Sequence, residues 1–159
     1  MARPRKRKAA AGDVASNRQA SWRYHLLERY EAGLALTGTE VKALRASGAQ
    51  LKDSYSVIRD GEAWLVGCYI PPYGPANRAN HDPERDRKLL LHRREIDSLY
   101  GMIREKGLTL VPTRVYFKDG RVKVEIAVAR GKEQRDKRRD IADRESKRRI
   151  ERELKARRR

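Results

Sequence analysis

The chain has 159 residues and a formal charge of +17, from 39 Lys and Arg against 22 Asp and Glu, and this length suits one domain with extensions rather than several domains. A single cysteine, Cys68, excludes an internal disulfide and a cysteine-based zinc cluster, so we expect a buried thiol in a reducing compartment. No apolar run approaches the roughly 18 residues of a membrane span, and no apolar segment follows the basic start as in a signal peptide, so we expect a cytoplasmic protein without a membrane partner.

The excess of positive charge is concentrated at the two ends of the chain. Residues 1–10 contain five basic and no acidic side chains, and residues 131–159 contain fourteen basic and seven acidic ones. Such an excess attracts polyanions through long-range electrostatics and counterion release. Nucleic acid is therefore the first class of partner to expect.

The first elements are expected from residue 17 onward. Residues 1–16 carry almost no large apolar side chain, so we expect a flexible basic arm there and the start of the fold near Asn17. From Tyr24 to Leu36 apolar residues recur at alternate positions, which predicts a long half-buried strand. A helix over "YHLLERYEAGL" is the alternative for this segment.

The stretch "TGTE" at residues 37–40 has the spacing of a helix capping box, in which Thr37 and Glu40 exchange hydrogen bonds. It predicts a short helix that runs to about Ser47. Gly48 is then free to adopt the positive φ of a helix end.

Two β-hairpins are predicted from Asp-Gly pairs set between apolar runs. The first turns at Asp60-Gly61 and the second at Asp119-Gly120. In the last strand, apolar residues from Val122 to Val128 alternate mainly with polar ones, so one face is buried and the other can meet solvent or a ligand.

Between the hairpins the chain contains a loop rich in Pro, Gly and Asn, then "RKLLLH" at residues 87–92. We expect this block to be a short strand buried on both faces, with the surrounding charges at its ends. A helix follows, because apolar residues from Ile96 to Ile103 form one stripe that Gly107 ends. This order of short elements predicts a mainly β fold, a small OB-type barrel with flanking short helices over residues 17–130.

The C-terminal segment, residues 131–159, has good helix propensity and i,i+4 pairs of opposite charge, but only three large apolar residues. These three cannot hold it on a core. It is either a solvated, frayed or disordered tail, or a segment that is disordered when free and becomes helical in a polyanionic channel.

Several stretches closely resemble the SsrA-binding proteins, the small protein B family of bacteria. They include "YEAGLALTGTEVKALR" (30–45), "HDPERDRKLLLHRREID" (81–97), "KVEIAVARGK" (123–132) and "DKR" (136–138), and the resemblance covers about residues 17–139 in the family's order. It implies an OB-type barrel that binds the tRNA-like domain of transfer-messenger RNA and delivers that RNA to stalled ribosomes in trans-translation. The basic tail would enter the small-subunit decoding site and the empty mRNA channel and become helical against ribosomal RNA.

The resemblance also implies partners and the absence of others. Elongation factor Tu and alanyl-tRNA synthetase would act indirectly, through the RNA. The protein would be a monomer without a cofactor, a bound metal or catalytic residues.

By position in the family's motifs, the RNA-facing residues would include Glu31, Leu90 and Lys123. Further candidates for the same role, added for their chemistry and nearness in sequence, are Asn17, Arg18, Tyr24, Arg45, Arg87 and Lys88. Lys and Arg can pair with phosphates, and Tyr24 can stack on an unpaired base. Glu31 would either accept from a base amino group or a 2′-hydroxyl, or hold a neighbouring Arg, and Leu90 would either pack or support the RNA face.

In the tail the resemblance implies that ribosome engagement depends on residues of the family's "GK...DKR" pattern, here Gly131, Lys132, Arg135, Asp136, Lys137 and Arg138. Two positions depart from the family. Residue 135 is Arg where many members have His, and residue 133 is Glu where a second Lys is common. The Arg135 guanidinium can stack on a base as an imidazole can.

Other functions are less consistent with the sequence. The three histidines lack the spacing of a zinc pair, and no phosphate-binding loop or nucleophile elbow occurs, which argues against an enzyme. Asp82, Glu84 and Asp86 could form an acidic metal triplet, but they lie among arginines and lack the rest of a calcium loop. A generic nucleic-acid-binding protein that uses basic tails on DNA, or a ribosome-associated structural protein, stays as the alternative.

Overall fold

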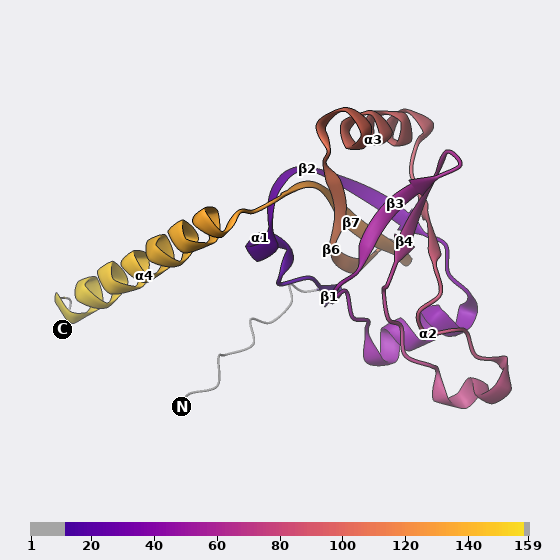
Figure 1. Cartoon of the computed structure of the whole chain (residues 1–159). Coiled ribbons are helices and arrows are strands. Elements are labelled where there is room, and N and C mark those ends of the chain that lie inside the picture. Colours follow the sequence, from indigo (N-terminus) through magenta and orange to yellow (C-terminus); the bar gives the residue numbers. More distant parts are fainter. Residues whose placement is uncertain (1–11, 158–159) are drawn as a thin grey trace.

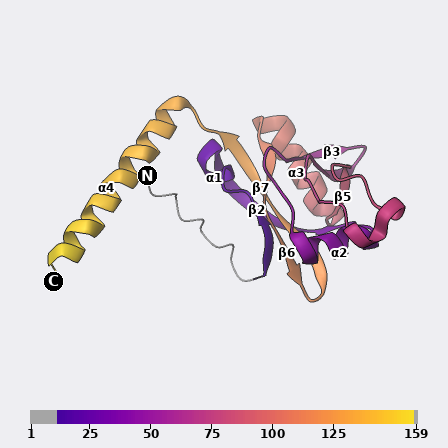
Figure 2. The ribbon, with the colours of Figure 1, turned by 90° about the horizontal axis from the view of Figure 1, so that it is seen from below.

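The computed structural model describes residues 12–157 of the chain. Figures 1 and 2 show a β-barrel with short helices around it and one long helix that extends away from it. In chain order the elements are β1 (Asp13–Ser16), α1 (Ala20–Arg23), β2 (Tyr24–Leu34), α2 (Gly38–Ser47), β3 (Tyr55–Arg59), β4 (Glu62–Val66), the 3-10 helix η1 (Gly74–Ala79), β5 (Arg87–Leu90), α3 (Arg93–Lys106), β6 (Thr109–Lys118), β7 (Arg121–Gly131) and α4 (Gln134–Arg157).

The strands form one closed sheet. Their order is β1-β6-β3-β4-β5-β2-β7, and β7 also pairs with β6, so six strands close a ring while β1 joins it at β6. All pairings between these strands are antiparallel. The predicted fold class, a small OB-type barrel with flanking short helices, is confirmed.

Strand β1 lies before the predicted start of the fold. Asp13 pairs with Tyr116 of β6, and Ala15 pairs with Val115. The pattern of residues 13–16 gave no signal for a strand, because only four residues are involved and their partner lies about 100 positions away. The remainder of the predicted basic arm, residues 1–11, lies outside the described residues.

The long strand expected from Tyr24 is β2, so the alternative of a helix is wrong. β2 pairs with β7 along most of its length and with β5 at its end. An irregularity in the β7 pairing between Leu26 and Arg29 shifts the register by one residue. The alternation therefore changes phase within the strand: Tyr24 and Leu26 lie on the same face as Arg29 and Glu31.

The capping box predicted for α2 is present. The backbone N–H of Thr37 donates to Glu40 Oε2 over 2.9 Å. Gly48 ends the helix with φ of +75°, and a Cβ at this position would lie 2.6 Å from the carbonyl oxygen of Val14. This helix end therefore requires glycine.

Both predicted hairpins form. β3 pairs with β4 around Asp60-Gly61, and β6 pairs with β7 around Asp119-Gly120. All four turn residues have φ between +51° and +73°. Positive φ at both central residues is the type I′ geometry, whose twist matches that of the two strands.

Strand β5 is not buried on both faces, so this expectation is wrong. Arg87 and Leu89 point inward and are 0% and 1% exposed, whereas Leu90 is 54% exposed. The outer face of β5 is left open to solvent, since Lys88 beside Leu90 is also partly exposed. The leucine block thus anchors the strand through one side and presents a leucine on the other.

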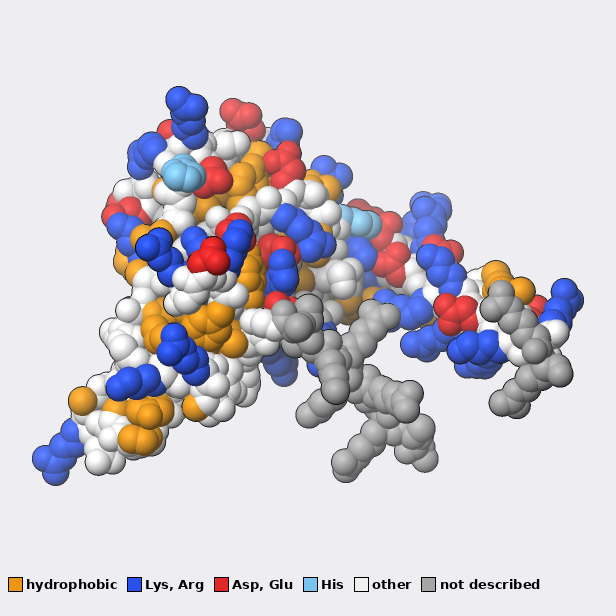
Figure 3. Space-filling model, turned by 180° about the vertical axis from the view of Figure 1, so that it is seen from behind, with side chains coloured by type: hydrophobic (Ala, Val, Ile, Leu, Met, Phe, Trp, Pro, Cys, Tyr) orange, Lys and Arg blue, Asp and Glu red, His pale blue; other side chains and the backbone are white. Residues whose placement is uncertain are grey.

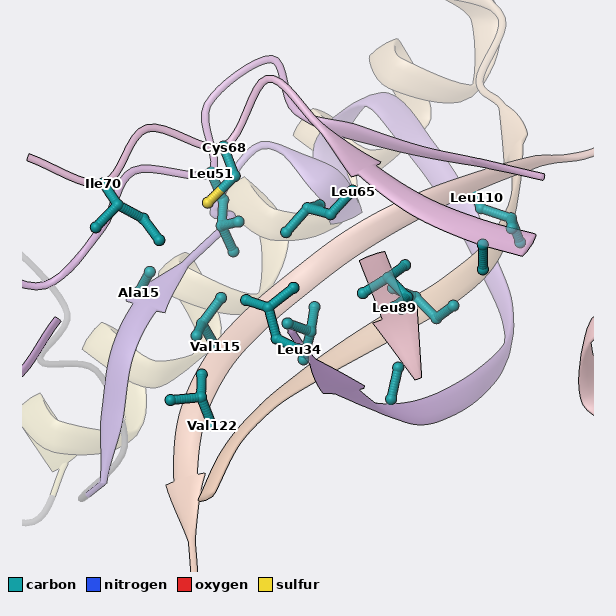
Figure 4. Close-up of a cluster of buried hydrophobic side chains, with 14 of the residues drawn as sticks. Ala15, Leu34, Leu51, Leu65, Cys68, Ile70, Leu89, Leu110, Val115 and Val122 are labelled. Atoms are coloured by element: carbon teal, nitrogen blue, oxygen red, sulfur yellow. The ribbon is translucent and has the colours of Figure 1, made fainter. Parts of the chain in front are cut away.

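The core fills the inside of the ring, and Figure 4 shows side chains from several strands meeting there. Leu65, Leu89, Leu110 and Val115 are each at most 1% exposed. Helix α3 lies over one end of the barrel in Figure 1, and its Leu99 is fully buried against this core. Burial of such apolar area is the main stabilising term of the fold.

The thiol of Cys68 lies within the same core, at 1% exposure, so the expectation of a buried thiol is confirmed. Burial raises the pKa of Cys68 to about 11.

Helix α4 contains no buried residue. Its three large apolar residues, Ile141, Ile150 and Leu154, are 43–54% exposed. The sequence leaves a solvated, frayed helix and a disordered tail as alternatives for the free protein, and the structure shows a continuous helix that leaves the barrel (Figure 1). Within residues 12–157, no helix is both long and apolar enough to cross a membrane.

Candidate nucleic-acid interface

Arg87, one of the predicted RNA-binding residues, belongs to a buried ionic network. Arg87 is fully buried and donates to Glu40 Oε1 over 2.8 Å and to the carbonyl oxygen of Cys68 over 2.6 Å. Glu40, also 0% exposed, accepts in addition from Arg85 over 2.6 Å. Arg87 therefore holds α2 and the loop before β5 on the barrel, and its assignment to RNA contact is wrong.

The buried carboxylate of this network is compensated by two cations. Burial tends to raise the pKa of Glu40, but hydrogen bonds from Arg85, from the Thr37 amide and from Arg87 outweigh it and lower the pKa. The carboxylate is therefore ionised at neutral pH between two guanidinium groups. Removal of one partner from such a buried ion pair leaves an uncompensated buried charge and destabilises the fold.

The three residues carried over from the family motifs share one outer face of the barrel. Across β5, β2 and β7, Leu90 pairs with Gly33, and Gly33 pairs with Lys123. Directly opposed residues in antiparallel strands point to the same side of a sheet. Glu31 precedes Gly33 by two positions in β2, so it lies on that side as well. We call the outer surface of β5, β2, β7 and β6 the outer face.

Gly33 leaves a gap in the middle of the row formed by Leu90, Gly33 and Lys123. A Cβ at Gly33 would lie 3.1 Å from the Cβ of Leu90, so the absence of a side chain leaves room for Leu90. The row presents an exposed apolar side chain on β5 and a partly exposed ammonium group on β7, with only backbone between them.

Glu31 is held by two donors rather than by an arginine. The hydroxyl of Tyr116 donates to Glu31 Oε2, and Lys118 Nζ donates to Oε1 over 3.0 Å. These hydrogen bonds lower the pKa of Glu31. Burial and the Glu31 carboxylate raise the pKa of Tyr116 to about 12, so the phenol stays a donor at neutral pH.

A hollow of about 450 Å³ surrounds this carboxylate. Its lining consists of Glu31, Lys118, Asp119, Arg121 and Lys123. Three cations against two carboxylates make the rim suitable for phosphate. The oriented carboxylate can accept from a base amino group or a 2′-hydroxyl.

Farther along the outer face lies a second ionic cluster around Glu125. This carboxylate accepts from Thr113 Oγ1 over 2.7 Å and from Arg29 over 2.9 Å, and Arg114 lies 3.3 Å away. Burial tends to raise the pKa of Glu125, but Thr113, Arg114 and Arg29 lower it. A shallow hollow of about 300 Å³, the middle hollow, includes these groups together with Asn17 and Ala20.

The outer face ends at α1 in a third hollow of about 300 Å³, the α1 pocket. Asn17 and Tyr24, two of the predicted RNA-binding residues, both line it, and Asn17 Nδ2 donates to the carbonyl oxygen of Pro112 over 3.1 Å. Tyr55, which the sequence did not single out, also lines it and is 48% exposed. The signal available in the sequence was a tyrosine near the start of the run that leads into the predicted Asp60-Gly61 turn.

The remaining predicted RNA-binding residues lie at separate places on the surface. Lys88 lies on the outer face of β5 and donates to Glu62 over 2.7 Å. Arg45, exposed in the last turn of α2, stacks 5.4 Å from the centre of the Phe117 ring. Arg18 is exposed and follows Asn17 just before α1.

The root of the tail is held against the start of the fold. Lys132 donates its backbone N–H to the carbonyl oxygen of Arg23 over 2.9 Å and its Nζ to that of Ser21 over 2.8 Å. Lys132 Nζ also lies 2.5 Å from Asp140 Oδ2 in α4, and His25 Nε2 lies 3.2 Å from Asp136 Oδ2. We call these contacts the tail root.

The acidic residues of the tail root have altered pKa values. The hydrogen bond to His25 lowers the pKa of Asp136, and the hydrogen bond from Lys132 lowers that of Asp140. Farther along α4, Arg144 lies 5.8 Å from the centre of the Trp22 ring. The tail helix is therefore joined to α1 and β2 by several groups.

The predicted ribosome-binding residues follow one another through this region. Gly131 is the last residue of β7, Lys132 and Asp136 belong to the tail root, Lys137 is half-buried, and Arg135 and Arg138 are exposed. Figure 3 shows Lys and Arg side chains, with Asp and Glu among them, along the protruding helix. The helix thus carries cations that the barrel does not cover.

The described residues contain no cluster of three or more His, Cys, Asp or Glu side chains that could hold a metal ion. In the acidic triplet considered above, Asp86 is paired with Arg59 over 2.6 Å. His81 lies 2.9 Å from the hydroxyl of Thr39 and 3.1 Å from the carbonyl oxygen of Ile70. These groups have structural partners.

Comparisons with known proteins agree on one family. A family model described as "SmpB protein" matches residues 14–156. The SsrA-binding protein of Syntrophomonas wolfei is 56% identical over 146 residues, which cover 92% of this chain and 93% of that protein. The SsrA-binding protein of Mycobacterium tuberculosis is 55% identical over 141 residues, or 89% and 88% of the two chains.

A solved structure described as "tmRNA-SmpB: a journey to the center of the bacterial ribosome" contains a similar chain. It is 49% identical to this one, with a TM-score of 0.63, and the match covers 75% of this chain and 84% of that chain.

Proposed function

The chain belongs to the SmpB family, and from this membership we propose that it binds transfer-messenger RNA and acts with it on the ribosome in trans-translation. The barrel binds the tRNA-like domain of the RNA, and the complex is delivered to stalled ribosomes. The protein acts as an RNA-binding protein rather than as an enzyme.

One observation carries the proposal for the barrel. Leu90, Gly33 and Lys123 lie in one row across three strands, and Glu31 lies beside them. This arrangement combines an apolar contact, a cation and an oriented acceptor on one open surface, which are the three kinds of group that recognise RNA bases, phosphates and 2′-hydroxyls.

Other residues extend this RNA surface. Lys88 lies beside Leu90, while Asn17, Arg18 and Tyr24 lie toward α1, and Arg45 adds a cation at α2. Arg87 has no part in it, because the side chain is buried.

For the tail, residues 131–159, we propose entry into the small-subunit decoding site and the empty mRNA channel. Exposed cations of α4 would replace counterions on ribosomal RNA. Gly131, Lys132, Arg135, Asp136, Lys137 and Arg138 would make or position these contacts. The tail helix has no core contact to give up on binding.

The wider assembly follows from the same proposal. Elongation factor Tu and alanyl-tRNA synthetase would meet the protein only through the shared RNA. The protein would act as a monomer in the cytoplasm, where ribosomes translate.

Truncation of the tail tests the division of labour. A chain that ends at Glu133 keeps β7, which runs to Gly131, and keeps the Lys132 contacts with α1. We expect this variant to bind transfer-messenger RNA within about threefold of the full chain, since the outer face is intact. With transfer-messenger RNA and purified stalled ribosomes, this variant should support no trans-translation, measured as the absence of a peptide tag on the stalled product.

Two results would contradict the proposal. Loss of RNA affinity in the truncated chain would place the main RNA site on the tail. Equal displacement of transfer-messenger RNA by duplex DNA at physiological salt would favour the generic nucleic-acid-binding alternative.

A further inference from the structure

The α1 pocket has aromatic and apolar walls. Tyr24 and Tyr55 line it together with Ala20 and Val111. Its volume of about 300 Å³ lies at the lower end of the range for small-ligand sites. Tyr55 is 48% exposed although it begins a barrel strand, so its ring is available to a ligand.

The edge of this pocket offers free polar groups. Asn17 uses its amide N–H on Pro112, which leaves its side-chain oxygen as an acceptor. Within residues 12–157, the side chains of Gln19 and Thr109, which also line the pocket, form no hydrogen bond. A planar ligand with donors and acceptors on its edge would satisfy these groups.

The charge of the pocket argues against a phosphate or a metal ion. Its two charged residues, Arg23 and Asp53, form an ion pair of 2.9 Å. They largely cancel each other's field, and neither is left to bind an ion alone. A neutral aromatic group therefore fits this site better than an anion.

The pocket is continuous with the proposed RNA surface. It shares Asn17 and Ala20 with the middle hollow, which extends to Arg114 and Glu125 on the outer face. An RNA strand that follows the outer face therefore also reaches the α1 pocket.

We propose that the α1 pocket binds one unpaired base of transfer-messenger RNA against Tyr24 and Tyr55, a site that rests on the function proposed above. Proteins recognise RNA mainly through unpaired bases that stack on aromatic rings and bond through their edges. Such stacking tolerates any base, and the polar edge of the pocket adds the preference.

Binding of transfer-messenger RNA by Tyr55 variants tests the site. Tyr55→Ala removes the exposed ring and should weaken binding about 5- to 150-fold, the effect of losing one stacked base. Tyr55→Phe keeps the ring and should bind like the unaltered chain. Tyr100 on α3 is also 48% exposed, so Tyr100→Ala is the matched control and should change binding less than twofold.

A photo-crosslinking residue at position 55 identifies the base. With transfer-messenger RNA we expect a crosslink confined to one unpaired segment, and none from the same residue at position 100. Equal affinities of Tyr55→Ala and Tyr100→Ala, or a crosslink to ribosomal RNA alone on stalled ribosomes, would overturn the proposal. Failure of the unaltered chain to bind the RNA would instead refute the proposed function.

Discussion

His25 Nε2 lies 3.2 Å from Asp136 Oδ2, so that the second residue of β2 is joined to the first turn of α4. Lys132 adds contacts to Ser21 and Asp140 on either side of this pair. The root of the tail is therefore fixed by side chains that the barrel and the tail share, although the rest of α4 is uncovered.

Asp136→Asn should loosen the tail root without unfolding the barrel. The His25 contact lowers the pKa of Asp136 below its ordinary value of 3.8, so the stabilisation is present above that value and is lost as pH falls through the lowered pKa. At neutral pH the variant should show faster amide hydrogen exchange in the first turns of α4. Asp143→Asn, farther along the exposed helix, should show none of this increase, and equal exchange in both variants would refute the role of the pair.

Glu40→Gln should strongly destabilise the barrel. It leaves the buried Arg87 without its counter-charge, and breaking a buried ion pair costs about 3–5 kcal/mol of unfolding free energy. The control is Glu62→Gln, because Glu62 pairs with Lys88 at the surface and such pairs contribute about 1 kcal/mol or less. Urea unfolding at pH 7 measures both, and a similar loss in the two variants would contradict this account.

The Glu40 carboxylate should also make the stability of the folded protein sensitive to acid. Because the pKa of Glu40 is lowered from 4.5 in the folded protein, its stabilisation is complete above pH 4.5 and is lost as pH falls through the lowered value. The urea concentration at the unfolding midpoint of the unaltered chain should therefore decrease as the pH is lowered below 4.5. For Glu40→Gln this midpoint should decrease less over the same pH range. Parallel curves of midpoint against pH for the two proteins would count against Glu40 as a source of acid sensitivity.

Lys123→Glu should weaken the binding of transfer-messenger RNA by about 1–3 kcal/mol, because a charged hydrogen bond is lost and repulsion is added. Lys106→Glu changes net charge equally at the exposed end of α3 and should have a smaller effect. Filter binding at several salt concentrations separates the local effect from the change in total charge. Equal losses in the two variants would remove Lys123 from the RNA site.

Cys68 should react slowly with thiol reagents in the folded protein. It is 1% exposed, and burial raises its pKa to about 11, so at pH 8 only about one thiol in a thousand is ionised. Labelling with a chromogenic disulfide should follow unfolding, and urea should accelerate it by orders of magnitude. Rapid labelling without denaturant would show that the core around β4 opens in the native state.

Features that depend on a few neighbouring residues could be predicted from the sequence. The Thr37–Glu40 capping box and the Asp-Gly turn at Asp60 carry their signals within four residues. The helix over residues 93–106 was recognisable because its apolar stripe repeats with the helical period. Glu31, Leu90 and Lys123 were found through family motifs, not through their chemistry.

Features that depend on distant contacts could not be predicted. Arg87 follows three other charged residues and precedes Lys88, and only the approach of Glu40 from 47 positions away buries it. The room for Leu90 depends on Gly33 of β2, and the place of Tyr55 in the α1 pocket depends on α1 and β6. No local pattern contains these relationships.

The direct passage from β7 into α4 also gives the tail a mechanical property. A helix of 24 residues is about 36 Å long, so it acts as a lever arm whose pivot is the tail root. A tilt of about 10° at this pivot displaces the far end by roughly 6 Å, about one helical turn. Small rearrangements among His25, Lys132 and Asp136 are thus amplified into a displacement of several ångström at the far end of the tail.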